Sequence, residues 1–411
     1  MNYLKKYLSM LVSLGLVLLV GCSKGDTVGD SLNSIGTSNN SVSIGVVLSS
    51  DSYDNIKELA LQDVERLNSP VDIVLNVAYD NLDYTTGLYI AQSYCKDAST
   101  VGVVGHLYSS LCLSLKNVYE DANMPLVVPY VSSEKLLNDD EQYIYQSVSD
   151  MSCDSKYFTT ISYYMNTVHN AVIVYSDTDY GNEFSKTLEN TLTEDKIINV
   201  IDKVCSPNVY REFPECLEKW QSLDFDTVFL VGDVDLYQYY IPDIKQVNPD
   251  ANIFISSDIE TTILYNPESY TYYDDVYQLS WSQYDQTQEL QNLYDRYYQA
   301  YGEYPSVREV QIYDDIMVIA KAIANENVRT SKDLKDYLDT SNDIQSIFGD
   351  GLYFKENRIQ NKQCYIHSYN QDGLISNSYS LTIEQIEDIW YNYYDESLIN
   401  EYLKVGEYYE R

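Results

Sequence analysis

Short apolar runs alternate with segments of helical periodicity along most of this chain. The run at 42–48 has strand character, and apolar residues then recur at helical spacing from Ile56 to Leu67. Such runs, separated by helices of about a dozen residues, indicate βαβ units, which build parallel sheets. A second series of the same kind starts near Asp150. We therefore predict an α/β fold with two doubly wound, Rossmann-like sheets in tandem.

The same pattern predicts the bounds of the other elements. Strands are expected at 71–79, 101–104, 126–128, 171–175, 197–201, 227–231, 253–256, 352–354 and 364–369. Helices are expected at 85–96, 110–122, 152–166, 182–193, 216–223, 237–247, 289–301 and 310–325. The 411 residues, of which 45% are hydrophobic, are enough for two domains.

The first residues have the features of a secretory signal peptide. Lys5 and Lys6 precede an uncharged apolar stretch, 8–20, which is too short for a permanent membrane span. The stretch is followed by LVGC at 19–22, which resembles the lipobox of bacterial lipoproteins. That resemblance implies cleavage before Cys22 and diacylation of its thiol. A core helix ending in cysteine is the alternative, and the polar sequence that follows argues against it.

Export and charge narrow the choice of partners. We expect 1–21 to be removed, and 22–41, rich in Gly, Ser and Asn, to be a flexible linker. The linker would tether an extracytoplasmic domain to the cell membrane through lipidated Cys22. The formal net charge of −37 argues against binding to nucleic acid, which needs a basic face.

Signatures of catalysis and of cofactors are missing from the sequence. It contains no GxSxG, HExxH, GxxxxGK or GxGxxG motif. Its three histidines, His106, His169 and His367, lie far apart, so a zinc site is not expected. We therefore predict a binding protein rather than an enzyme, without a metal or a cofactor.

Six cysteines follow Cys22, an even number that permits disulfides in an exported chain. Cys205 and Cys216 flank what the pattern predicts to be one short loop, and they are the favoured pair. The others either form further bridges or are buried thiols: Cys95, Cys112, Cys153 and Cys364.

Pairs of serines follow two strands of the first predicted sheet. Ser109 and its neighbour follow the strand at 101–104, and Ser132 and its neighbour follow the strand at 126–128. In doubly wound sheets, ligands bind outside these strand ends, where loops expose backbone N–H groups and helix N-termini. Capping of the next helix is the alternative role for any one serine. Two such places in one sheet favour a carboxylate-binding edge.

The stretch 101–136 resembles the leucine/isoleucine/valine-binding proteins of bacterial ABC importers, which have the type I periplasmic-binding fold. The motifs that lie as in that family are GHL at 105–107, SS at 109–110, YED at 119–121 and Pro129. Further family motifs follow in order: DTDYG at 177–181, SSD at 256–258, YD at 313–314 and DG at 372–373. The resemblance covers roughly 42–380 and implies two lobes joined by a three-strand hinge.

The resemblance also implies a ligand pocket. Ser109 matches the residue that binds the ligand carboxylate. Ser132 matches a residue that contacts both the carboxylate and the ammonium, together with the backbone of Tyr130 and Val131.

The second lobe is expected to complete this pocket. Tyr180 matches a tyrosine that closes over the ligand, and Asp258 matches the acid that pairs with the α-ammonium, where the family usually has the longer Glu. A ligand with both charges then meets donors from one lobe and an acid from the other. Binding is thereby coupled to closure of the lobes.

The sequence departs from the family in three places. The first loop, 49–54, lacks the usual glycines, and Tyr53 is the candidate to replace an aromatic residue that lines the side-chain pocket. A second family tyrosine falls near Val234. Residues 383–411 extend past the family core as an acidic helical tail. These departures concern the specificity for the ligand.

The resemblance implies the division of the chain. Lobe 1 is expected at 42–149 and 280–345, and lobe 2 at 150–279 and 346–382. The crossings between the lobes are expected near 148–151, 277–284 and 343–350.

The function implied by the resemblance is capture of an amino acid, branched-chain-like or another small polar solute, and its delivery to an ABC permease. Two alternatives remain open. The chain is a ligand-sensing lipoprotein on the same scaffold, which signals to a membrane receptor, or a surface or structural lipoprotein whose pocket has decayed.

Overall fold

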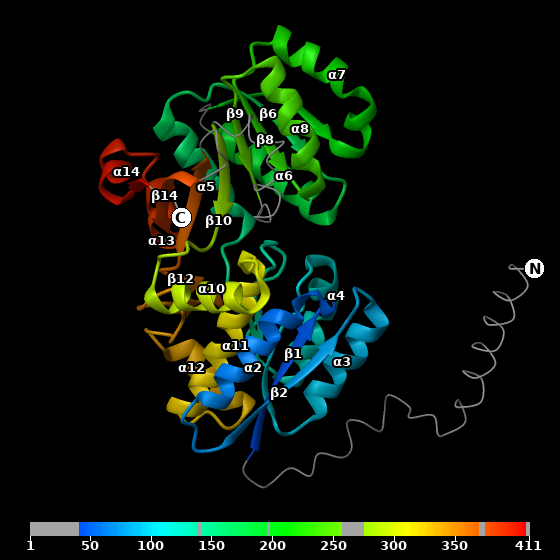
Figure 1. Cartoon of the computed structure of the whole chain (residues 1–411), viewed down its shortest axis with the longest axis vertical. Coiled ribbons are helices and arrows are strands. Elements are labelled where there is room, and N and C mark those ends of the chain that lie inside the picture. The colour runs from blue at the N-terminus through cyan, green and yellow to red at the C-terminus, as the bar shows by residue number, and fades with distance from the viewer. Residues whose placement is uncertain are drawn as a thin grey trace, which may run out of the picture. The chain divides into compact units, whose positions relative to one another are not determined.

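The structure, a computed structural model, describes residues 41–137, 141–194, 198–232, 234–256, 275–369 and 375–407, with the backbone alone at 207–212 and 234–239. In this part of the chain the strands form two sheets, each with helices packed against it (Figure 1). The prediction of two doubly wound α/β units is confirmed. Cys22 and the predicted signal and linker at 1–40 lie outside the described residues.

The first sheet has the strand order β11-β12-β5-β4-β3-β1-β2. Its strands are β1 (Ser41–Leu48), β2 (Asp72–Tyr79), β3 (Thr100–Val104), β4 (Leu126–Val128), β5 (Ile144–Gln146), β11 (Tyr353–Lys355) and β12 (Arg358–Gln360). Its helices are η1 (Asp51–Tyr53), α2 (Asp54–Arg66), α3 (Tyr84–Lys96), α4 (Ser109–Ala122), α10 (Gln288–Tyr301), α11 (Val307–Asn325) and α12 (Ser331–Thr340). The pairs from β1 through β3 and β4 to β5 are parallel.

Both faces of the first sheet are covered, as its apolar strands predict. Successive side chains of a strand point to opposite faces of the sheet. Val46 of β1 accordingly lies in the core that contains Ile56 of α2, whereas Val47 lies in the core that contains Tyr119 of α4. The carboxyl ends of the parallel strands therefore open into loops between two layers of helices.

The second sheet has the strand order β15-β14-β13-β10-β9-β8-β6-β7. Its strands are β6 (Asn170–Tyr175), β7 (Asn199–Cys205), β8 (Thr227–Val231), β9 (Asn252–Ile255), β10 (Val276–Ser280), β13 (Gln363–Tyr369), β14 (Ile375–Thr382) and β15 (Lys404–Glu407). Its helices are α5 (Met151–Met165), α6 (Asp179–Thr193), α7 (Ser206–Ser222), α8 (Val234–Val247), α13 (Ile383–Tyr391) and α14 (Glu396–Tyr402). The strands from β7 through β6, β8 and β9 to β10 pair in parallel. Strands β13, β14 and β15 extend the sheet by antiparallel pairing.

The chain passes between the two sheets after β5, after β10 and after β12. The third passage differs from the predicted one at 343–350. Residues 353–360 form the β11–β12 hairpin, and β12 pairs with β5 through Arg358 and Gln146. The boundary drawn at 346 is therefore wrong, because the hairpin completes the first sheet. The rest of the division into lobes stays a prediction.

The sequence predicts a helical tail at 383–411. The structure differs from this prediction, because the tail contains a strand as well as helices. Two helices, α13 and α14, are followed by β15, which adds an antiparallel strand beside β14. Lys156 of α5 holds the tail through an ion pair with Glu387 of α13, with a Nζ–Oε2 distance of 2.6 Å. The tail thus completes the edge of the second sheet.

No disulfide joins Cys205 and Cys216, contrary to the prediction. The segment between them is not a short loop, because α7 starts directly after Cys205 and runs past Cys216. Eleven residues of helix separate the two by about 16 Å along the axis. A disulfide needs a Cα–Cα distance of about 4.4–6.8 Å. The other cysteines after Cys22 are thiols as well, and Cys112, Cys153 and Cys364 are buried.

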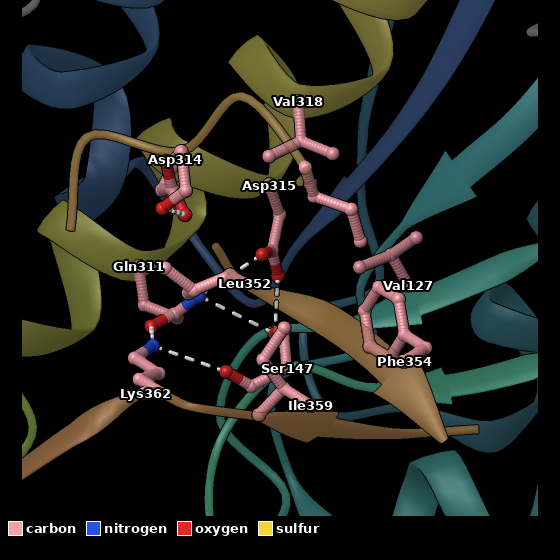
Figure 2. Close-up of a pocket in the computed structure, with 12 residues that line it drawn as sticks. Val127, Ser147, Gln311, Asp314, Asp315, Val318, Leu352, Phe354, Ile359 and Lys362 are labelled. Carbon is pink, nitrogen blue, oxygen red and sulfur yellow. Dashed lines mark hydrogen bonds between the residues drawn. The ribbon is translucent and has the colours of Figure 1, made fainter. Parts of the chain in front are cut away.

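A buried polar network links the passages between the sheets (Figure 2). Ser147 follows β5 and Lys362 follows β12, and Lys362 Nζ donates to the Ser147 carbonyl oxygen at 3.0 Å and to Gln311 Oε1. Ser149 accepts from the indole Nε1 of Trp281, which follows β10, at 2.8 Å. All three passages therefore meet at residues 147–149.

Asp315 of α11 sits at the centre of this network. Its Oδ2 lies 2.7 Å from the Ser147 hydroxyl, which also lies 2.9 Å from the Val128 carbonyl oxygen. The hydroxyl has one proton for two acceptors. Ser147 Oγ donates to Asp315 Oδ2 when the carboxyl group is ionised, whereas a protonated Asp315 donates to Ser147 and leaves the hydroxyl proton for Val128. Burial, together with the negative charge of Asp314, raises the pKa of Asp315 to about 7, in agreement with the protonated form.

The network lines a small cavity, to which Val127, Leu352 and Phe354 also contribute (Figure 2). Its volume of about 20 Å³ has room for about one water molecule. An amino acid does not fit there, so this cavity is part of the hinge and not the ligand site.

The raised pKa of Asp315 predicts how the stability depends on pH. An unfolded Asp has a pKa of about 3.9, so between about pH 4 and pH 7 the folded state keeps a proton that the unfolded state loses. Asp315 therefore lowers the free energy of unfolding as the pH rises through this window, by up to roughly 1.4 kcal/mol per pH unit. We expect Asp315→Asn to gain stability over the wild type as the pH rises from 4.5 to 7.

Urea denaturation at several pH values measures this difference. Lys362, whose pKa is lowered to about 8 by burial, stays charged across the window. Asp314, whose pKa is also raised by burial, remains in both proteins. Asp336→Asn, at an exposed ion pair of α12 with Lys332, is the matched control and should show no such trend. A constant difference between Asp315→Asn and the wild type would contradict the protonated state.

Candidate functional site

The loops after β1, β3 and β4 meet at one side chain, Arg308, near the start of α11. A capping box fixes this start, because Glu309 N–H donates to the Ser306 hydroxyl while Ser306 N–H donates to the Glu309 carboxylate at 2.8 Å. Arg308 is thereby held at the carboxyl edge of the first sheet, where the serine pairs were predicted to bind a ligand.

Three tyrosines surround the Arg308 guanidinium. Its Nη1 donates to the hydroxyl of Tyr53 at 3.0 Å and to that of Tyr108 at 3.3 Å. Its Cζ lies 4.1 Å from the ring centroid of Tyr130 and 5.3 Å from that of Tyr108. Cations placed over aromatic faces in this way gain about 0.5–2 kcal/mol. We call Tyr53, Tyr108 and Tyr130 the tyrosine cage.

No carboxylate of the described residues forms an ion pair with Arg308. The nearest acid in sequence, Glu309, is buried and accepts hydrogen bonds from Tyr297 OH at 2.5 Å and from Ser306. The Nε of Arg308 is shielded from solvent and has no partner in the described part of the chain. The cage thus holds a positive charge that no described carboxylate neutralises.

Ser109 is the first residue of α4, directly after Tyr108 of the cage. It is half-buried, and its hydroxyl makes no hydrogen bond to any described residue. The helix has no side-chain cap, since Tyr108 occupies the N-cap position. Ser109 thus lies at a helix N-terminus, where the N–H groups of the first turn have no partner within the helix and the helix dipole is positive.

Ser132 lies two residues after Tyr130 and is buried. Its hydroxyl also lacks a hydrogen-bond partner among the described residues, whereas its carbonyl oxygen accepts from Met151 N–H at 2.8 Å. Val131, between Tyr130 and Ser132, is fully buried, and its carbonyl oxygen accepts from Gln146 Nε2 at 2.7 Å. The neighbouring hydroxyl of Ser133 is engaged by Glu183 of α6 at 2.9 Å. Ser132 is therefore the serine of this loop that is available to a ligand.

Tyr53 ends the short η1 turn and is buried, with its hydroxyl against Arg308. Burial raises the pKa of Tyr53, an effect that Arg308 partly opposes. The phenol thus stays protonated at neutral pH. The interpretation of Tyr53 as an aromatic lining residue stays a prediction, and its contact with Arg308 was not foreseen.

Tyr180 lies at the start of α6, a helix that packs against the second sheet. Its hydroxyl donates to the carbonyl oxygen of Ser256, at the end of β9, with a distance of 2.9 Å. The next residue, Gly181, packs against the loop before the helix, because a Cβ there would lie 2.2 Å from the Ser176 carbonyl oxygen. Tyr180 is thus held at Ser256, directly after β9.

Two predicted residues have no structural account here. Asp258 lies in 257–274 and Cys22 in 1–40, both outside the described residues. For Val234, where the family has a tyrosine, the structure gives the backbone alone. The structure therefore brings Tyr53 and Tyr130 together at Arg308, and Ser109 and Ser132 lie on the loops that carry the cage. Tyr180 lies in α6, against the second sheet, and the role of Asp258 stays a prediction.

The histidines have structural partners. His106 is buried, with Nδ1 2.8 Å from Asp80 Oδ2 and Nε2 3.0 Å from the hydroxyl of Tyr119. Burial lowers the pKa of His367 to about 4, so this ring is neutral. Among the described residues, no group of three or more His, Cys, Asp and Glu side chains is placed to hold a metal ion.

The sequence matches the family described as periplasmic binding protein over residues 59–373. The chain belongs to this family. The predicted family and the type I periplasmic-binding fold are confirmed. In the described part of the chain, no helix combines the length and the apolar composition that a membrane crossing needs. A comparison with curated protein sequences gave no match.

Solved structures of the same fold include two proteins with bound amino acids. One is an ABC transporter substrate-binding protein from Desulfitobacterium hafniense in complex with Leu, with 17% identity, a TM-score of 0.69 and coverage of 82% of this chain and 99% of that one. The second is the branched-chain amino acid transporter substrate-binding protein LivJ from Streptococcus pneumoniae with isoleucine, with 15% identity, a TM-score of 0.70 and coverage of 83% and 99%.

A third structure of this fold contains a different kind of ligand. It is a solute-binding protein of an ABC transporter from Rhodopseudomonas palustris in complex with 3,4-dihydroxy benzoic acid. The identity is 13%, the TM-score is 0.67, and the alignment covers 80% of this chain and 93% of that one. Identities this low show the shared fold and leave the ligand open.

The cage itself allows a test of the Arg308 contacts. Tyr130→Leu and Arg308→Met each remove one partner of the closest stacked pair. We expect their effects on the free energy of unfolding to be non-additive by about 0.5–2 kcal/mol in a double-mutant cycle. Urea denaturation of the four proteins measures this. The same cycle with Tyr89→Leu, an exposed tyrosine of α3, is the control and should be additive. Additivity in the first cycle would mean that the stacking contributes nothing.

Proposed function

We propose that this chain is a lipid-anchored, extracytoplasmic solute-binding protein that captures an amino acid or a similar small polar solute between two lobes. It would deliver the solute to an ABC permease. The observation that carries the proposal is the pair of hydroxyls, Ser109 and Ser132, that no described group satisfies. Both lie at the carboxyl edge of a parallel sheet, where doubly wound folds bind their ligands.

The family membership supports the capture of a solute, and the complexes with Leu and isoleucine support an amino acid as the solute. In this proposal the ligand carboxylate binds the two serine hydroxyls and the N-terminus of α4. The α-ammonium binds Asp258, and Tyr180 closes over the ligand from the second lobe. Since each lobe then satisfies one charge, the bound ligand favours the closed form.

The anchor is tested by Cys22→Ser. If Cys22 is the lipidated residue, this change abolishes acylation and leaves an uncut precursor. Mass spectrometry of detergent-extracted protein measures both effects. Cys95→Ser is the control and leaves processing unchanged. A mature N-terminus at another residue, or no diacylglyceryl mass on Cys22, contradicts the anchor and leaves the binding proposal standing.

The binding function is tested by a thermal-shift screen of the amino acids, followed by calorimetry with the best hit. A ligand at about 100 times its Kd stabilises by roughly 2.7 kcal/mol, which raises the melting temperature measurably. Trp281 gives a second signal, because its ring lies 5.1 Å from that of Tyr130 at the hinge. Failure of every amino acid to bind would reject the amino-acid form of the proposal.

Two variants locate the site once a ligand is known. Asp258→Ala should weaken binding about 30-fold or more, because a buried charge pair loses a partner at a cost of roughly 2–5 kcal/mol. Ser109→Ala should cost less, roughly 1–2 kcal/mol, since backbone donors remain. The controls are Asp250→Ala, before β9, and Ser114→Ala, whose hydroxyl bonds within α4 to the Ser110 carbonyl oxygen. If a variant and its control bind the ligand with equal affinity, the substituted residue does not contact the ligand and the site lies elsewhere.

A further inference from the structure

The guanidinium of Arg308 has one edge that forms hydrogen bonds and one edge that has no partner among the described residues. Nη1 makes both hydrogen bonds to the tyrosine cage. The N–H groups of Nε and Nη2 donate to no described residue, and Nε is buried. These two nitrogens form the side of the planar fork that binds a carboxylate through two parallel hydrogen bonds.

A buried donor without a partner costs about 1–3 kcal/mol, so its persistence needs a compensating interaction. The chain has 63 acidic residues against 26 basic ones, so acids for an internal ion pair are plentiful. Lys116, for comparison, is buried with Glu141 at 2.5 Å. Arg308 instead lies among aromatic rings, which stabilise its charge and offer no acceptor for the free edge.

The groups around Arg308 are also donors. Tyr108 directly precedes Ser109 and the uncapped N-terminus of α4, and Tyr130 lies two residues before Ser132. The hydroxyls of Ser109 and Ser132 and the N–H groups in the first turn of α4 can therefore add hydrogen bonds to an anion bound at Arg308. Together with Arg308, these groups form a site with a formal positive charge and two parallel N–H donors. The serines alone would provide uncharged donors only.

We propose that Arg308 is the anchor for a carboxylate of the ligand, and that the ligands are small organic carboxylates whether or not they carry an ammonium group. The inference rests on the proposed solute-binding function and narrows its ligand class. A positive anchor makes the carboxylate the required group. The acid in the second lobe then selects among carboxylates and does not decide whether they bind.

The test compares matched compounds on the mature protein by thermal shift and calorimetry. One set is L-leucine, 4-methylpentanoate, which lacks the ammonium, and 3-methylbutylamine, which lacks the carboxylate. A second set is 3,4-dihydroxybenzoate, benzoate and catechol, and inorganic phosphate tests a general anion site. We expect binding by at least one carboxylate of a set and none by the amine, catechol or phosphate.

Variants assign this requirement to Arg308. Arg308→Gln should weaken the best carboxylate about 30-fold or more, the effect of losing one partner of a buried charge pair. Arg308→Lys keeps the charge and loses the planar fork of donors. Its affinity for the carboxylate should therefore lie between that of the wild type and that of Arg308→Gln. Arg66→Gln removes the same charge from an exposed site of α2, where Asp63 keeps Arg296, and should leave the affinity unchanged.

The melting temperature and the Trp281 emission of the ligand-free variants show whether they fold. If Arg308→Gln does not fold, the compound sets on the wild type and the Arg308→Lys variant still decide. Binding of the amine, catechol or phosphate without the carboxylates, or unchanged affinity in Arg308→Gln, overturns the anchor and leaves solute binding intact. Failure of every compound to bind the wild type rejects both proposals.

Discussion

The packing of this protein depends on a buried polar contact at Ser147. Its carbonyl oxygen accepts from Lys362, and its hydroxyl lies between the Val128 carbonyl oxygen and Asp315. Buried polar groups have lost their contacts with bulk water and need partners inside the protein. Three passages of the chain between the sheets are thereby joined at one place, and the edges of both sheets are positioned by it.

The same region connects the hinge to the ligand edge. Trp281 donates to Ser149 and packs edge-on against Tyr130, with ring centroids 5.1 Å apart. Tyr130 in turn lies under Arg308. Contact is therefore continuous from the passage after β10 to the guanidinium. In the proposed mode of binding, a carboxylate at Arg308 would act on the ring that touches the hinge, and such a contact would couple binding to closure of the lobes.

The sequence predicts best where a strand is buried on both faces. The strands at 126–128 and 227–231 have the expected bounds, because a run of apolar residues is all that such a strand needs. It predicts poorly where pairing partners decide. β5 has three residues, and β14, at 375–382, carries alternate serines and is held by β13 and β15. Local sequence patterns were enough to predict the fold class. They did not predict the third passage between the sheets, after β12, because it depends on the pairing of β12 with β5.

The site divides in the same way. The positions of Ser109 and Ser132 at the carboxyl edge could be predicted, because topology alone places residues there that follow parallel strands. Arg308 could not, since its partner Tyr53 is separated from it by 255 positions in the sequence. Its one local signal, the capping box of Ser306 and Glu309, marks a helix start and says nothing of charge. The placement of Arg308 among three tyrosines, without an ion pair to any described carboxylate, emerges only when the loops are folded together.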